Sequence, residues 1–113
     1  MVNTNTKMKM KMKMKMKNKI NLALQVLPQA EGIDSYDLVD LAIAEIGASG
    51  LKYKVCPFET VIEGTYDEVM ALVKRVHEVL EKNGTQKLMT YIKIQTVFQS
   101  DVTIDDKMAK YED

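Results

Sequence analysis

Several residue types are scarce in this chain of 113 residues, which has one cysteine, one histidine, two prolines and no tryptophan. A single cysteine, Cys56, cannot form an internal disulfide, and it fits a reducing cytoplasm. The single histidine, His77, has no second histidine with which to form a familiar metal site. No apolar run approaches the length of a membrane span, and the N-terminus lacks the apolar segment of a secretory signal. We therefore expect a cytoplasmic protein with no metal site and no membrane partner.

The net charge of the chain is zero, but its charged residues are unevenly distributed. Residues 1–19 hold seven of the sixteen basic residues and no acid, so residues 20–113 carry nine basic and sixteen acidic residues, a net charge of −7. An acidic body argues against nucleic acid as a partner, because phosphate binding needs a basic patch. The length suits a single small domain.

A low-complexity stretch precedes this body. Residues 7–17 read KMKMKMKMKMK, and their alternation would allow them to prolong a following strand. A lysine at every second position repels its neighbours, so we interpret residues 1–18 as a mobile extension and 19–113 as the folded domain. A basic arm for anionic surfaces, a methionine-rich Cu(I) site and an adhesive edge strand are the alternatives.

Hydrophobic periodicity and capping signals predict the elements of the body. Asp34 or Ser35 caps a first helix, Thr65 and Glu68 form the capping box of a second, and Thr103 caps a short last helix with Ile104, Met108 and Tyr111 on one side. The predicted strands cover 20–27, 51–55, 58–64 and 87–98, and the main helices cover 36–49 and 66 to about 83. The order β-α-β-β-α-β predicts a ferredoxin-like α+β fold with a four-stranded antiparallel sheet in the order 4-1-3-2.

Both main helices are expected on one face of this sheet, which leaves the other face open. In the third strand Phe58, Thr60 and Ile62 would face the helices, whereas Glu59 and Glu63 would stand side by side on the open face. Like charges on one face repel, so solvent, a basic neighbour or a cationic ligand must offset them. Lys93, on the open face of the fourth strand, is the candidate basic neighbour.

Five separated blocks resemble a known family. ALQVLP (23–28), SGLKY (49–53), TVIEG (60–64), YDEVMALVKRVHE (66–78) and TYIKI (90–94) occur in the order found in the small thiamine-binding-like proteins. The resemblance covers residues 20 to about 111. It implies a ferredoxin-like chain that assembles as a homotetramer, a dimer of dimers, and binds thiamine or its hydroxymethylpyrimidine part without catalysis. The alternative is a homo-oligomeric interaction or regulatory module with no small-molecule ligand.

The candidate ligand-binding residues combine hydrogen-bonding, charged and aromatic side chains. Amides would read a pyrimidine edge, carboxylates would face a thiazolium cation, and an aromatic ring would stack on the heterocycle. Thr60 faces the helices, so it would meet a ligand only in a pocket between sheet and helix. For Glu59 and Glu63, contact with a ligand and contact with a second subunit are equally favoured. The full set is Asn21, Gln25, Tyr53, Glu59, Thr60, Glu63 and Lys93; no catalytic residue and no cofactor is expected.

Overall fold

The computed structural model describes residues 17–112. Most of the Lys/Met repeat, and with it the prediction of a mobile extension over 1–18, lies outside the described residues.

A four-stranded antiparallel sheet forms the centre of the fold. Its strands are β1 (Lys19–Gln29), β2 (Lys52–Val55), β3 (Thr60–Thr65) and β4 (Lys87–Gln95). They lie in the order β2-β3-β1-β4, which is the predicted order read from the other edge. The ferredoxin-like α+β fold is thereby confirmed.

The fourth strand is shorter than predicted. It ends at Gln95, because the chain then turns, with Ser100 N donating to Val97 O at 3.3 Å. After this turn Val102 N donates to Lys19 O at 2.9 Å, so the chain crosses back toward the start of β1. The apolar residues Val97 and Phe98, which suggested a longer strand, lie in the turn and are exposed.

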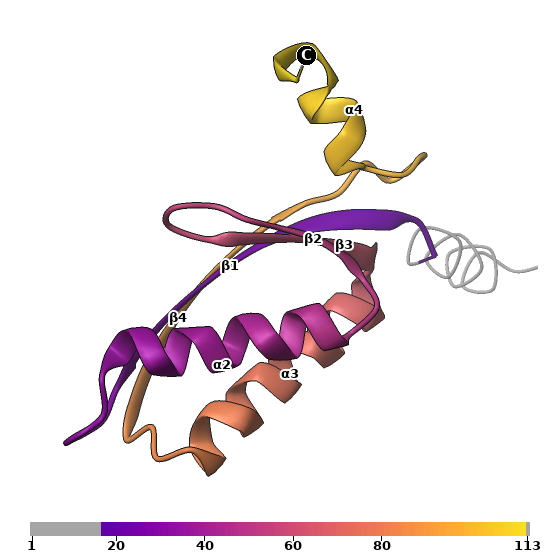
Figure 1. Ribbon diagram of the computed structural model, residues 1–113. Coiled ribbons are helices and arrows are strands. Elements are labelled where there is room, and N and C mark those ends of the chain that lie inside the picture. The colour runs from indigo at the N-terminus through magenta and orange to yellow at the C-terminus, as the bar shows by residue number, and fades with distance from the viewer. Residues whose placement is uncertain (1–16, 113) are drawn as a thin grey trace, which may run out of the picture.

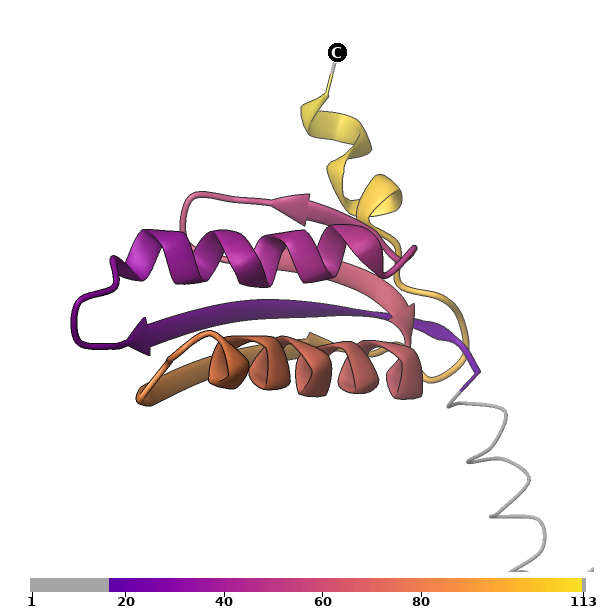
Figure 2. The same cartoon turned by 60° about the horizontal axis from the view of Figure 1, so that its bottom comes forward.

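Two helices, α2 (Ser35–Ala48) and α3 (Tyr66–Lys82), cover one face of the sheet (Figures 1 and 2). Asp34 caps α2 by accepting a hydrogen bond from Tyr36 N at 2.8 Å. The capping box predicted for α3 is present, with Thr65 and Glu68 each bonded to the other's backbone N–H. These caps supply acceptors to backbone donors that a helix start leaves without partners.

The core lies between the sheet and these helices. Alternate residues of β1 and every third or fourth residue of α3 point into it, as their periodicities predict. Its most completely buried side chains are Ile20, Leu22, Leu38, Ile46, Ile62, Val69, Leu72, Val76 and Leu80. On α2 the buried residues are Leu38, Ala42 and Ile46, whereas Val39 and Ile43 are only half-buried.

The opposite face of the sheet is not wholly open, which corrects the sequence-based expectation. The short helix α4 (Ile104–Met108) and the 3-10 turn η1 (Ala109–Tyr111) lie on the side away from α2 and α3 (Figure 1). Ile104 is buried there, while Tyr111 is exposed. Across residues 17–112, no helix has the length and apolar character needed to cross a membrane.

Candidate ligand-binding site

A pocket lies between α2 and the hairpin that joins β2 to β3. Its volume is about 270 Å³, just below the roughly 300–1,000 Å³ typical of small-molecule sites. Its apolar sides come from β1, from α2 and from the hairpin, and include Leu24, Val39, Ile43 and Val55. Val39 and Ile43, which are half-buried, border this pocket, and Val39 also packs against the core.

Two highly exposed aromatic side chains border the pocket. Tyr36, in the first turn of α2, is 80% exposed, and Phe58, in the hairpin, is 82% exposed. Phe58 was expected to face the helices from within the third strand; it does border the pocket beside α2, but it precedes β3 and is exposed. Strand β3 begins only at Thr60, and Cys56 N donates to Glu59 O at 2.9 Å, so Phe58 lies in a turn where the alternation of a strand does not apply.

Four polar side chains also border the pocket. Gln25 is half-buried on β1, Thr60 is buried at the start of β3, Glu59 is partly buried beside it, and Asp40 is exposed on α2. The structure therefore brings together three of the predicted site residues, Gln25, Glu59 and Thr60. Thr60 borders a pocket between sheet and helix, which is the kind of pocket in which the sequence predicts that it could meet a ligand.

Sequence reasoning missed Tyr36 and Asp40. Both lie on the exposed side of α2 in the sequence pattern, where they are indistinguishable from an ordinary solvated helix face. For Tyr36 the available signal was its position two residues after the Asp34 cap, which places it in the first turn of the helix.

Lys93 forms the ion pair predicted for one of the two carboxylates, and its partner is Glu59, with Nζ 3.4 Å from Oε2. Lys93 also borders a shallow recess of about 270 Å³ on the open face, together with Gln95 and Lys107. Glu59 borders this recess as well as the pocket. A single carboxylate thus lies between the two cavities.

Glu63 and Asn21 lie beneath the C-terminal segment, which we define as residues 101–112, and Asn21 also borders the recess that Glu59 and Lys93 line. Glu63 is 6% exposed, and its Oε1 accepts a hydrogen bond from Ile104 N at 2.7 Å. Asn21 is 3% exposed, and its Nδ2 donates to Val102 O at 3.1 Å. Glu59 and Glu63 are therefore not a solvent-facing pair, because the chain after Asp101 covers one of them.

Tyr53 lies on the helix side of β2 and outside the lining of the pocket. A side-chain carbon added at Gly47 of α2 would lie 3.1 Å from Tyr53 Oη, so the ring packs against that helix.

The remaining side chains with possible chemistry are Cys56 and His77. Cys56 is a free thiol that borders the pocket. His77 is hydrogen-bonded to Thr90, with Nε2 2.9 Å from Oγ1. Among the described residues, no three His, Cys, Asp or Glu side chains gather closely enough to hold a metal ion.

The fold and the pocket define the class of protein: a small ferredoxin-like α+β domain with an aromatic-bordered cavity beside a carboxylate. Comparison of sequences identifies the family. Residues 22–112 match the model of the thiamine-binding protein family, and the chain belongs to that family.

Its relatives include proteins without an assigned function. A UPF0045 protein of Clostridium perfringens is 35% identical over 91 residues, which cover 80% of this chain and 95% of that protein. A solved domain of unknown function from Bacillus cereus has a TM-score of 0.81 and 36% identity, with 85% of this chain and 92% of that one covered. A solved Thermotoga maritima protein, assigned provisionally to thiamine biosynthesis or salvage, has a TM-score of 0.75 and 30% identity. The match covers 83% of this chain and 99% of that one.

Proposed function

We propose that the protein is a non-catalytic, cytoplasmic binding protein for thiamine or its hydroxymethylpyrimidine part. The observation that carries this proposal is the pair of exposed aromatic rings, Tyr36 and Phe58, at the border of an apolar pocket that also contains carboxylates. Membership of the thiamine-binding protein family supports it. The free thiol of Cys56 is in keeping with a reducing compartment.

The pocket residues match the chemistry of such a ligand. Aromatic faces favour a flat heterocycle and also a cationic ring, because their faces carry negative charge. Carboxylates of Asp40 and Glu59 accept hydrogen bonds from an amino group or lie beside a thiazolium charge. The volume of about 270 Å³ is small for a drug-sized molecule and suits a single substituted ring within the pocket.

Isothermal titration calorimetry with thiamine and with hydroxymethylpyrimidine tests the proposal. We expect saturable heat with the native protein and a rise in melting temperature, because a ligand that binds only the native state stabilises it. Phe58→Ala should weaken binding about fivefold or more, since a stacked aromatic contact contributes on the order of 1 kcal/mol. Phe58 is so exposed that its removal should leave stability almost unchanged.

Phe98→Ala is the matched control, because Phe98 is an exposed aromatic outside both the pocket and the C-terminal segment. Its variant should bind like the native protein. If neither ligand produces heat or a thermal shift at millimolar concentration, the alternative of an interaction module without a small-molecule ligand replaces this proposal.

We also propose that the protein assembles with itself as a homotetramer, a dimer of dimers. The part of the open face beyond the C-terminal segment exposes the apolar side chains of Leu27, Met89 and Tyr91. A contiguous apolar surface of this kind favours a partner over water. Light scattering at micromolar concentration measures the mass directly, and a monomer alone would exclude this assembly.

A further inference from the structure

The C-terminal segment is anchored at the centre of the sheet. Val102 and Ile104 are both buried, and their backbone groups bond to Asn21 of β1 and Glu63 of β3. Lys19 N of β1 also donates to Asp101 Oδ1 at 2.8 Å. The start of the segment is therefore fixed to the two central strands of the sheet, whose other face packs against the helices in the core.

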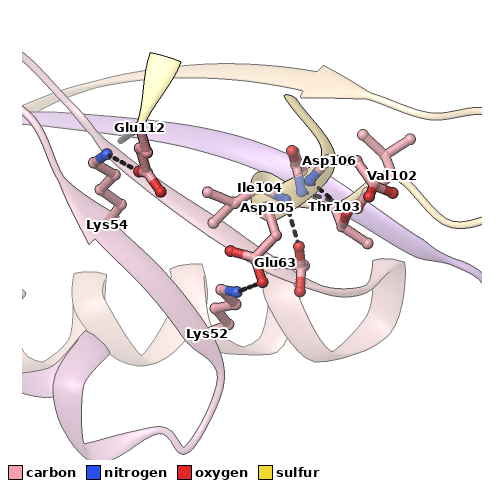
Figure 3. A network of polar contacts seen from close by, with 10 residues as sticks. Lys52, Lys54, Glu63, Val102, Thr103, Ile104, Asp105, Asp106 and Glu112 are labelled. Carbon is pink, nitrogen blue, oxygen red and sulfur yellow. Dashed lines mark hydrogen bonds and ion pairs between the residues drawn. The ribbon is translucent and has the colours of Figure 1, made fainter. Parts of the chain in front are cut away.

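From this anchor the segment reaches over the edge strand β2. Asp105 forms an ion pair with Lys52, and Glu112 forms one with Lys54 at 3.2 Å between Oε1 and Nζ (Figure 3). Both contacts are made to β2, although they come from residues seven positions apart in the segment. The two lysines point to the same side of the strand because they are two residues apart.

Strand β2 needs such support more than the other strands do. It has only four residues, all exposed, and within the sheet it pairs with β3 alone. On its helix side Tyr53 packs near Gly47 of α2. On its other side the ion pairs of Lys52 and Lys54 hold it, so β2 lies between α2 and the C-terminal segment.

The same strand leads directly into the pocket. Val55, the last residue of β2, and the following Cys56, Pro57 and Phe58 all border the cavity. The hydrogen bond from Cys56 N to Glu59 O, at 2.9 Å, closes the hairpin at this point. Displacement of β2 therefore displaces the side of the pocket that carries Phe58.

We propose that the C-terminal segment is a clamp that positions the β2–β3 hairpin for ligand binding. Lys52, Lys54, Asp105 and Glu112 are positioning residues: they act on the pocket through β2 and do not touch the ligand. An unclamped hairpin must be ordered when a ligand binds, which reduces affinity, and by reciprocity a bound ligand tightens the clamp. The effect on affinity rests on the proposed function, whereas the effect on the hairpin does not.

Charge reversal with rescue tests the clamp. Lys52→Asp places two carboxylates together, and adding Asp105→Lys restores an opposite pair. We measure hydrogen exchange at Cys56 N–H by nuclear magnetic resonance and, separately, the dissociation constants for thiamine and hydroxymethylpyrimidine. Since exposed ion pairs are individually weak, we expect Lys52→Asp to increase the exchange rate and the dissociation constants about threefold to tenfold. The double variant should return both to within about twofold of the native values.

Lys74→Asp on α3 is the matched control, because Lys74 is exposed and lies outside both the pocket and the contacts of the C-terminal segment. It should change neither readout. If Lys52→Asp is poorly folded, Lys54→Gln makes a milder break, and its exchange rate should still rise, by about twofold. Unchanged exchange at Cys56 in both variants, or failure of the double variant to restore it, overturns the clamp. If the native protein binds neither ligand, the proposed function fails, and the exchange measurements still decide the clamp.

Discussion

Truncation of Glu63 should destabilise the fold, because this buried carboxylate holds the C-terminal segment to the sheet. Glu63→Ala leaves Ile104 N–H without its acceptor at 2.7 Å, in a place where both residues are less than 10% exposed. A hydrogen bond to a charged group contributes about 1.5–3 kcal/mol, and an unsatisfied buried donor adds to the loss. We therefore expect the free energy of unfolding to fall by about 2–4 kcal/mol.

Urea denaturation followed by circular dichroism measures this change. For a domain of this size each kcal/mol corresponds to about 4–8 °C in melting temperature, so thermal unfolding should show a shift of about 10 °C or more. Glu63→Gln keeps an acceptor of the same shape and should lose less than half as much. A Glu63→Ala variant within about 0.5 kcal/mol of the native protein would show that the C-terminal segment is not held as described.

Three further predictions concern other parts of the chain. Gly84→Ala should lower the free energy of unfolding, measured by urea denaturation, by about 1 kcal/mol or more, because Gly84 has a φ of +96° and an added Cβ would lie 2.9 Å from Ile33 Cδ1. Gly50→Ala is the control that isolates the backbone part of this loss, because Gly50 has a φ of +81° and no atom within 4 Å of an added Cβ. Alkaline pH should weaken the contact between Asp105 and β2, because the hydrogen bond to Asp105 raises the pKa of Lys52, so its contribution is fully present below about pH 10.5 and is lost as pH rises through the folded-state value. If the native protein and Lys52→Gln differ in their free energy of unfolding by the same amount at about pH 9 and well above about pH 11, this expectation is contradicted. Deletion of residues 1–15 should leave the mass in light scattering unchanged apart from the lost residues, and dissociation on deletion would show that the Lys/Met repeat takes part in assembly.

The fold was largely predictable because its strongest local signals agree with each other. The alternation of β1, the capping box of Thr65 and Glu68 and the apolar stripe of α3 each specify one element, and a ferredoxin-like order follows from them. Strand ends were less predictable. Thr96, Val97 and Phe98 continue a strand-like composition, and the turn that ends β4 depends on contacts with β1 from the other end of the chain.

The candidate site was predicted in part, for a different reason. Glu59 and Glu63 have equivalent places in the alternation of the third strand, and only tertiary contacts separate their roles. Residues 101–104 cover Glu63, whereas Glu59 remains beside the pocket. The short stretch DVTI offers no periodicity from which its packing on a sheet could be read. Phe58 was assigned to the third strand because its apolar side chain continues the alternation of that strand, whereas it lies in the turn before β3.

Glu59 borders both the pocket beside α2 and the recess on the open face, so a ligand in the pocket can change the electrostatic environment of Lys93 in the recess. Its carboxylate pairs with Lys93 at 3.4 Å on the open face while it also borders the pocket beside α2. A cation in the pocket competes with Lys93 for this carboxylate and leaves the lysine with an unbalanced charge. If copies of the chain meet across that face, the charge they present to each other changes with pocket occupancy. Subunits and ligand would then influence each other's affinity by the same factor, and the strength of assembly would report the supply of the ligand.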